Sequence, residues 1–295
     1  MTIISRQNSF VTTSINQALK NGIKKLKSTE VDSAILDAEV LLAFILKKDK
    51  KFLYTHPEHK PQKNRLKKFY KLIARRAKNE PVAYLTNQKE FYGLNFYVNR
   101  NVLIPRPATE LLVEEALNYI KKIKAKNFTI CDVGTGSGAI IISLAKNIKK
   151  SLPKQNFKFI GADISRGALN VAQKNAKANK IKINFLKSNL LKNLTDKKIN
   201  ILTANLPYLK NKDIKDALKH EPKQALSGGQ NGAEIFKKLF RQISGLEFPP
   251  KIIILEIGDK QAKILTELAK NLLPQYQRKI KKDLCGLDRV MTLKI

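Results

Sequence analysis

The first part of the chain carries apolar residues at helical spacing. In the run Ile35–Leu46 they recur every three or four positions, which is typical of a helix with one buried side. Asp32, just before this run, is a candidate N-cap. The pattern continues to about Lys78. It predicts a small helical bundle over residues 1–80.

The character of the sequence changes at Pro81. The segment "AYLTNQKEFYGLNFYV" is rich in aromatic residues, which favour strands, and Gly93 and Asn95 offer turn positions. We therefore expect a β-hairpin over residues 81–104 that links two domains.

Beyond Pro107, short apolar runs alternate with helical segments. The runs are "FTICDV", "FKFIGAD", "IKINFL", "NILTAN" and "KIIILEI". Such alternation predicts an α/β domain over residues 105–295, with a doubly wound, largely parallel, Rossmann-like sheet. Ligands of such sheets bind outside the carboxyl ends of the strands. Two further strand-like runs around Gly286 predict an antiparallel hairpin at one edge of the sheet.

The first expected strand is followed by a glycine-rich loop, Gly134-Thr135-Gly136-Ser137-Gly138, and then by a helical run. Glycines let the backbone turn tightly and approach a ligand closely. Asp163 ends the second strand, where a carboxylate binds ribose hydroxyls. With Ala139 the loop also fits the dinucleotide-binding pattern, so the glycines alone leave NAD open as the cofactor.

The tetrapeptide Asn205-Leu206-Pro207-Tyr208 follows the fourth strand. It favours a methyl-donating cofactor over NAD, because it suits methyl transfer to a planar nitrogen. Such a nitrogen must turn its lone pair toward the methyl group, so acceptors must hold its N–H bonds elsewhere. The side-chain oxygen of Asn205 is one acceptor. The carbonyl of Leu206 is a second, since Pro207 restricts the residue before it to extended geometry. Tyr208 is expected to pack flat on the substrate.

These segments together resemble the HemK/PrmC family of protein-(glutamine-N5) methyltransferases. The resemblance runs from about residue 35 to the C-terminus. It rests on the ordered set "LDAEVLLA", "EPVAYLTNQKEFYG", "VLIPRPATELLVE", "DVGTGSGAI", "ANLPY", "ALSGG", "ILEIG" and "DLCGLDRV".

The resemblance implies a seven-stranded methyltransferase domain that uses S-adenosylmethionine, and a helical domain that helps to dock the substrate. The implied substrate is the glutamine of the Gly-Gly-Gln motif in peptide-chain release factors. It also implies cofactor contacts from Arg106, Thr109, Asn189 and Leu190, and a substrate contact from Phe91.

Three positions depart from the family pattern. Leu206 replaces the usual proline, Asn189 replaces an acidic residue at the third strand end, and Ala108 replaces a glutamate. Asn-Leu-Pro-Tyr also resembles the form found in RNA adenine-N6 methyltransferases, so an RNA or DNA N6-adenine methyltransferase is the alternative enzyme. A basic RNA-binding protein that has lost catalysis is the alternative outside enzymes.

The tripeptide Gly228-Gly229-Gln230 reproduces the sequence of the implied acceptor motif inside the enzyme itself. It lies in "ALSGGQNGAE", directly before the helical run "AEIFKKLF". We interpret it as a loop ahead of that helix and not as a substrate.

The chain of 295 residues has 57 Lys and Arg against 24 Asp and Glu, a formal net charge of +33. Such a balance attracts polyanions or acidic partners. Most of the excess is lysine scattered over helix faces, which composition alone also explains. The charge therefore leaves open a weak affinity for nucleic acid or ribosomes.

The two cysteines, Cys131 and Cys285, are too few for a disulfide framework. The sequence has no metal-ligand spacing, no apolar run of membrane-spanning length and no signal peptide. We expect a cytoplasmic, monomeric protein without a metal ion or a membrane.

Overall fold

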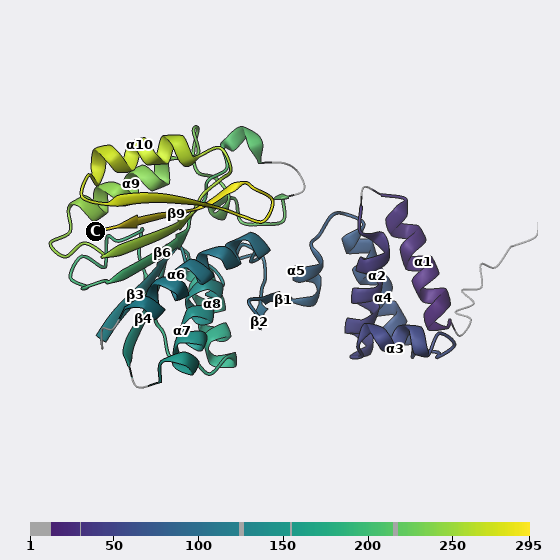
Figure 1. The fold of residues 1–295 in the computed structure, drawn as a ribbon. Coiled ribbons are helices and arrows are strands. Elements are labelled where there is room, and N and C mark those ends of the chain that lie inside the picture. The colour runs from purple at the N-terminus through teal and green to yellow at the C-terminus, as the bar shows by residue number, and fades with distance from the viewer. Residues whose placement is uncertain (1–12, 30, 124–126, 154, 215–217) are drawn as a thin grey trace, which may run out of the picture. The chain divides into compact units, whose positions relative to one another are not determined.

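The computed structural model describes residues 13–29, 31–123, 127–153, 155–214 and 218–295. The chain divides into two compact units, Met1–Asn87 and Gln88–Ile295 (Figure 1). The division differs from the expected boundaries at 80 and 104. It falls once, after Asn87, and leaves no separate linking segment.

The first unit is helical. Its helices are α1 (Ile15–Lys27), α2 (Ala34–Leu46), α3 (Lys50–Thr55), α4 (Lys63–Arg76) and α5 (Val82–Thr86). Leu41, Leu42 and Phe69 are fully buried between them. Helices α1 and α4 approach closely at Gly22, where a Cβ atom would lie 2.9 Å from the Phe69 ring. The bundle confirms the helical period of the sequence.

Two local expectations for this unit are wrong. Helix α2 begins after Ser33, not Asp32, and the Ser33 hydroxyl donates a hydrogen bond to Asp37 (2.9 Å). The stretch after Pro81 forms the short helix α5 and not the start of a strand. Proline at a helix N-terminus is favoured because its missing N–H would have no partner there, and this outweighs the aromatic strand preference.

The second unit contains a seven-stranded sheet in the order β5-β4-β3-β6-β7-β9-β8. The strands are β3 (Asn127–Val133), β4 (Asn156–Asp163), β5 (Asn184–Lys187), β6 (Ile201–Asn205), β7 (Ile252–Glu256), β8 (Gln277–Lys282) and β9 (Asp288–Lys294). Strands β3 to β7 pair in parallel, whereas β9 pairs antiparallel with both β7 and β8. The doubly wound sheet and its antiparallel edge hairpin are confirmed.

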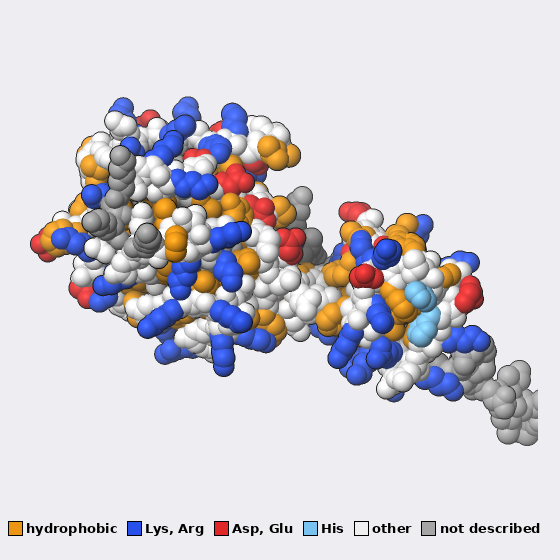
Figure 2. Space-filling model, turned by 60° about the horizontal axis from the view of Figure 1, so that its bottom comes forward, with side chains coloured by type: hydrophobic (Ala, Val, Ile, Leu, Met, Phe, Trp, Pro, Cys, Tyr) orange, Lys and Arg blue, Asp and Glu red, His pale blue; other side chains and the backbone are white. Residues whose placement is uncertain are grey.

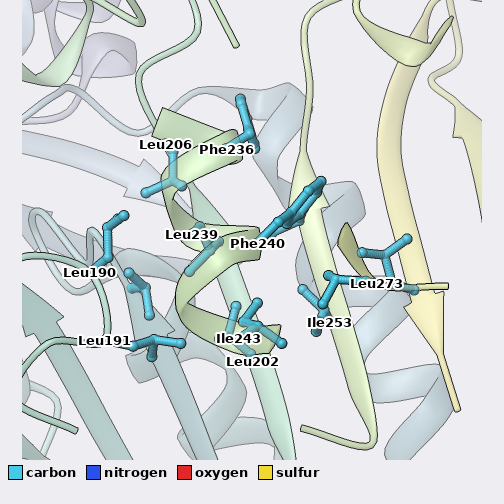
Figure 3. Packing of buried hydrophobic residues seen from close by; sticks show 14 of the residues in the cluster. Leu190, Leu191, Leu202, Leu206, Phe236, Leu239, Phe240, Ile243, Ile253 and Leu273 are labelled. Atoms are coloured by element: carbon cyan, nitrogen blue, oxygen red, sulfur yellow. The ribbon is translucent and has the colours of Figure 1, made fainter. Parts of the chain in front are cut away.

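Helices cover both faces of this sheet (Figure 1). One face packs on α6 (Glu110–Lys122), α7 (Ala139–Ser151) and α8 (Arg166–Ala178), and the other on α9 (Glu234–Ser244) and α10 (Ala262–Leu272). Figure 3 shows Phe236, Leu239 and Phe240 of α9 packed over the sheet beside Leu206. Burial on both faces explains why these strands are continuous apolar runs.

The predicted hairpin exists as β1 (Gln88–Phe91) and β2 (Leu94–Tyr97), but it is part of the second unit. Asn175 of α8 fixes it there: its side-chain oxygen accepts from the Tyr97 N–H (2.7 Å) and its nitrogen donates to the Tyr97 carbonyl (2.9 Å). The Glu110 carboxylate accepts from the Tyr92 N–H (2.8 Å). The "EFYG" and "RPATE" segments therefore meet in space.

Within the described part of the chain, no helix has the length and apolar character needed to span a membrane. Both cysteines are free thiols, Cys131 buried and Cys285 exposed.

Candidate active site

A cavity of about 280 Å³ opens at the carboxyl ends of the parallel strands, where such sheets bind ligands. Its lining comes from the loops that follow β3, β4, β5 and β6, and from the segment ahead of α6. Of the residues predicted to bind the cofactor or the substrate, the cavity is lined by Thr109, Gly134, Thr135, Gly136, Ser137, Asp163, Asn189, Leu190, Asn205, Leu206 and Pro207.

The glycine loop owes its curvature to backbone conformations that other residues rarely adopt. Gly134, Gly136 and Gly138 have φ angles of +72°, +54° and +80°. A Cβ atom at Gly138 would lie 2.8 Å from Ile142 of α7 and 3.2 Å from Ala172 of α8, so this position also lets α8 pack closely against the start of α7. Three left-handed residues in five curl the backbone into a cradle that faces the cavity.

Two buried side chains hold this cradle from behind. The Asp132 carboxylate, fully buried at the end of β3, accepts from the hydroxyls of Thr135 (2.7 Å) and Thr203 (2.8 Å). Burial raises the pKa of Asp132 to about 7. Asn175 donates to the Ser137 carbonyl (2.8 Å). Neither residue was predicted to have a role. For Asp132 the signal is a charged residue within an apolar strand, because such a group must find partners.

Asp163 stands at the end of β4, as predicted, and lines the cavity. Its carboxylate accepts from the backbone N–H groups of Gly136 (2.8 Å) and Ser165 (2.8 Å). Burial raises the pKa of this carboxyl. The two bonds fix the carboxylate next to the glycine loop, and its remaining lone pairs are suited to accept hydroxyl groups of a ligand.

At the end of β5, Asn189 and Leu190 both line the cavity. Asn189 takes the place of an acidic residue, and its side-chain oxygen accepts from Lys238 Nζ (3.1 Å). Leu190 has a left-handed backbone (φ +56°) and packs into the core. This end of the cavity therefore offers an amide and an apolar side chain.

Asn205 is held by two partners from other parts of the chain. Its amide nitrogen donates to the Thr109 hydroxyl (3.1 Å) and to the Glu256 carboxylate (3.0 Å). A carboxylate only accepts hydrogen bonds, so the nitrogen, and not the oxygen, must face Glu256. Both amide hydrogens are used in this way, which leaves the side-chain oxygen of Asn205 available to an N–H donor in the cavity.

Glu256 connects the two polar ends of the tetrapeptide. It ends β7 directly opposite Asn205 in the strand register and is 1% exposed. Besides Asn205 it accepts from the Tyr208 hydroxyl (3.3 Å). Burial raises the pKa of Glu256, and burial with the neighbouring Glu256 charge raises the pKa of Tyr208 to about 12. No role was predicted for Glu256; its signal in the sequence is a lone carboxylate inside the apolar run "KIIILEI", because a buried carboxylate needs partners.

The sequence predicts a role only for the backbone carbonyl of Leu206, whereas in the structure its side chain also has a packing role. Its side chain is 3% exposed and belongs to the core beneath α9 (Figure 3). A Cβ atom on Gly134 would lie 3.1 Å from it. Leu206 thus joins the glycine loop to the hydrophobic core at the position where the family usually has a proline.

The tripeptide Gly228-Gly229-Gln230 lies in a loop ahead of α9, as expected. The loop supports the tetrapeptide: a Cβ atom on Gly228 would lie 2.7 Å from the Pro207 carbonyl oxygen and 2.8 Å from the Tyr208 Cα. Gln230 is exposed. Gly228 is thus required for the close packing of this loop against the backbone of the tetrapeptide.

Arg106 does not line the cavity. It forms an ion pair with Glu221, a buried residue whose carboxylate also accepts from the Ile104 N–H (3.0 Å). The pair ties the segment before α6 to the loop after the tetrapeptide. The position of Arg106 suits a role in holding these two segments together. It suits the expected cofactor contact less well.

Phe91 is also placed differently from the expectation of a substrate contact. Its side chain is 1% exposed and packs edge-on against Phe96, with ring centroids 6.1 Å apart. It therefore has no surface to offer a substrate. A strand position in an aromatic hairpin is equally suited to core packing, and the sequence pattern does not separate the two roles.

The site fits S-adenosylmethionine in its chemistry. The curled glycine loop gives close backbone approach, the Asp163 carboxylate suits ribose hydroxyls, and Leu190 and Leu206 give apolar walls. A doubly wound sheet whose β6 ends in Asn205, pinned for hydrogen bonding to a planar nitrogen, defines an S-adenosylmethionine-dependent methyltransferase.

Comparisons with known proteins narrow this class. Residues 17–86 match the model of the PrmC N-terminal domain, and residues 124–287 match that of a methyltransferase domain. The release factor glutamine methyltransferase of Clostridium acetobutylicum is 33% identical over 285 residues, 94% of this chain and 97% of that protein. The release factor glutamine methyltransferase of Coxiella burnetii is 35% identical over 281 residues, which cover 94% of this chain and 98% of that protein. The chain belongs to the release factor glutamine methyltransferase family, as the sequence motifs indicated.

Solved structures with the same fold include more distant proteins. The hMettl16 catalytic domain, solved in complex with MAT2A 3'UTR hairpin 6, has a TM-score of 0.56 and 14% identity, and covers 86% of this chain and 92% of its own. At this identity the likeness shows the fold alone.

Proposed function

We propose that this protein methylates the side-chain amide nitrogen (N5) of the glutamine in the Gly-Gly-Gln motif of peptide-chain release factors, in the cytoplasm. The observation that carries the proposal is the pinned amide of Asn205. With its nitrogen bound to Thr109 and Glu256, its oxygen accepts one N–H of the acceptor glutamine.

The second N–H of the acceptor amide donates to the backbone carbonyl of Leu206. Leu206 directly follows Asn205 at the end of β6 and lines the cavity. When bound, S-adenosylmethionine supplies an electrophilic methyl group on sulfur. Two acceptors on the N–H bonds orient the nitrogen for in-line attack, so alignment supplies most of the acceleration. The N–C bond forms as the methyl–sulfur bond breaks, and the amide nitrogen then releases one of its two protons to water. The Tyr208 ring, held through its hydroxyl by Glu256, packs against the amide plane.

The cofactor is held by the loops after the first three parallel strands. Residues 134–138 cradle it through their backbone, Asp163 accepts its ribose hydroxyls, and Asn189 and Leu190 contact its adenine. Gly134, Thr135, Gly136 and Ser137 of this loop line one cavity together with Asp163, Asn189 and Leu190. Thr109 lines the same cavity and accepts a hydrogen bond from Asn205 (3.1 Å), so it contacts the cofactor and also positions Asn205.

The helical unit, residues 1–87, docks the release factor. Its surface carries large apolar side chains that the bundle does not cover: Ile35, Leu36, Phe44 and Tyr54 are 52%, 49%, 38% and 63% exposed. Three of them lie on α2. Exposed apolar groups gathered on one element are typical of a protein contact surface.

The positive charge supports weak, nonspecific affinity for nucleic acid or ribosomes by a monomeric enzyme. Figure 2 shows Lys and Arg side chains spread over the visible surface of both units. Lysines also gather at the amino ends of the strands, around a second hollow: Lys149, Lys158, Lys182, Lys197 and Lys198. Binding of this kind weakens steeply as salt rises, so methylation of a release factor in rising salt measures the contribution of charge.

The proposed function is tested with Asn205→Ala and with a release factor whose acceptor glutamine is alanine. Asn205→Ala should leave S-adenosylmethionine affinity nearly intact and lower kcat by about 100-fold or more, because the lost contact aligns the transition state. Methyl incorporation into the alanine-containing factor, or full activity of Asn205→Ala, would contradict the assignment.

An RNA adenine methyltransferase is the second candidate, favoured by Leu206 in Asn-Leu-Pro-Tyr and by the +33 charge. Parallel assays with ribosomal RNA and with a release factor decide between the two substrates.

A further inference from the structure

The β8–β9 hairpin ends in a loop that presents apolar side chains to solvent. In this tip loop, residues 283–287, Leu284 is fully exposed (108%) and Leu287 is 42% exposed. Neither belongs to a hydrophobic cluster of the described residues. An uncovered leucine pair costs solubility and gains nothing for this fold, which suggests a contact with another molecule.

Hydrogen bonds hold the tip loop in one conformation. The Asp283 carboxylate accepts from the N–H groups of Cys285 (3.0 Å) and Leu287 (3.1 Å) and from Arg289 Nε (3.0 Å). The Asp283 N–H donates to the Leu287 carbonyl (2.8 Å), and Gly286 turns the chain with φ +78°. A loop that is already ordered loses little entropy when it docks.

The strand register places this loop at the carboxyl ends of the parallel strands, which is the end of the sheet that holds the active site. Strand β9 runs antiparallel to β7, with Val290 opposite Glu256, and the Ile257 N–H donates to the Arg289 carbonyl (2.9 Å). The residues before Arg289 therefore extend past the end of β7, the same end at which Glu256 holds Asn205.

The tip loop and its flanking residues, 282–289, have no net charge although the protein is strongly basic. The segment 282–289 has two basic and two acidic residues, and they pair with one another: Lys282 with Asp288 (3.2 Å) and Arg289 with Asp283 (3.0 Å). Because these charges are compensated within the hairpin, the surface that remains for a partner is the apolar one of Leu284 and Leu287.

We propose that Leu284 and Leu287 dock against an apolar patch on the folded body of the protein substrate, next to the loop that carries its acceptor glutamine. This rests on the proposed function for the identity of the substrate. The docked tip holds the substrate body while the acceptor side chain enters the cavity. It selects a folded protein over an isolated peptide of the same acceptor sequence.

The test is the double variant Leu284→Ser/Leu287→Ser, with Phe248→Ser as the matched control. Phe248 is 47% exposed and precedes β7, at the amino ends of the parallel strands and so at the end of the sheet opposite the active site. The dissociation constant for a release factor is measured by calorimetry. In parallel, kcat/KM is measured with the release factor and with a short peptide that contains Gly-Gly-Gln.

The double variant should bind the release factor about ten-fold or more weakly, as expected for loss of a central apolar contact, while peptide methylation and Phe248→Ser stay at the wild-type level. An unchanged dissociation constant would overturn the docking proposal, as would an equal loss on peptide and protein. If wild-type enzyme binds the factor without methylating its glutamine, the proposed function fails, and the calorimetric comparison still decides the role of the tip loop.

Discussion

Glu256 accepts a hydrogen bond from the amide nitrogen of Asn205 at 3.0 Å, and the two residues lie opposite each other in the register of β6 and β7. A buried carboxylate is costly unless it is hydrogen-bonded, and here it accepts hydrogen bonds from Asn205 and Tyr208 and also from Thr109. Glu256 therefore orients both polar side chains of the tetrapeptide without lining the cavity itself.

Glu256→Gln should separate activity from stability. The glutamine keeps the size of the side chain but loses one acceptor oxygen, so the Asn205 amide is free to turn. We expect kcat to fall about ten- to hundred-fold, in line with loss of a hydrogen bond to a charged group. The melting temperature should stay level or rise, since a buried charge is removed. Glu115→Gln, which breaks the partly exposed pair with Lys281, is the control and should keep its activity.

Asp163→Ala should weaken S-adenosylmethionine binding by roughly 1.5–3 kcal/mol, through loss of charge-assisted hydrogen bonds to ribose. Because Asp163 also holds the N–H groups of Gly136 and Ser165, the melting temperature should fall as well. Calorimetry with the wild type should show no comparable affinity for NAD. Asp196→Ala changes an exposed carboxylate beside the lysines of the second hollow. It should leave cofactor affinity unchanged, and an equal loss in this variant would argue against a specific role for Asp163.

Gly228→Ala should damage the tetrapeptide through packing alone. The added methyl group would lie 2.7 Å from the Pro207 carbonyl oxygen, so the backbone that carries the acceptor groups must shift. Overpacking of this kind costs about 1–3 kcal/mol, and kcat should fall with it. Gly245→Ala places its methyl group no closer than 3.8 Å to its neighbours and serves as the control. Equal activity of the two variants would show that the tetrapeptide tolerates displacement.

Asp132→Asn should change how stability depends on pH. In the folded protein, burial raises the pKa of Asp132 to about 7 from 3.8, so the folded state binds this proton more tightly than the unfolded chain. The contribution of the group to stability is therefore full below pH 4 and is lost as pH rises toward 7. Asparagine does not titrate. The wild type should lose more melting temperature than the variant between pH 4.5 and about 8, and parallel curves would contradict the shift.

The sequence by itself determined the features that depend on local chemistry. Continuous apolar runs predict buried parallel strands because both faces of such strands are covered. The glycine loop is recognisable because only glycine readily adopts the φ angles of Gly134, Gly136 and Gly138. The ordered motifs, from "DVGTGSGAI" to "ANLPY" and "DLCGLDRV", carried the family. Each of these signals lies within a few consecutive residues.

Only the tertiary structure decided which distant residues meet. Glu256 follows Asn205 by 51 positions, and nothing local to either residue reveals that pairing in β6 and β7 sets them side by side. The same holds for Arg106, which pairs with Glu221, and for Phe91, whose burial depends on the hairpin packing in the second unit. Side-chain type tells what a residue is able to bind, whereas strand order and register determine which partner it finds.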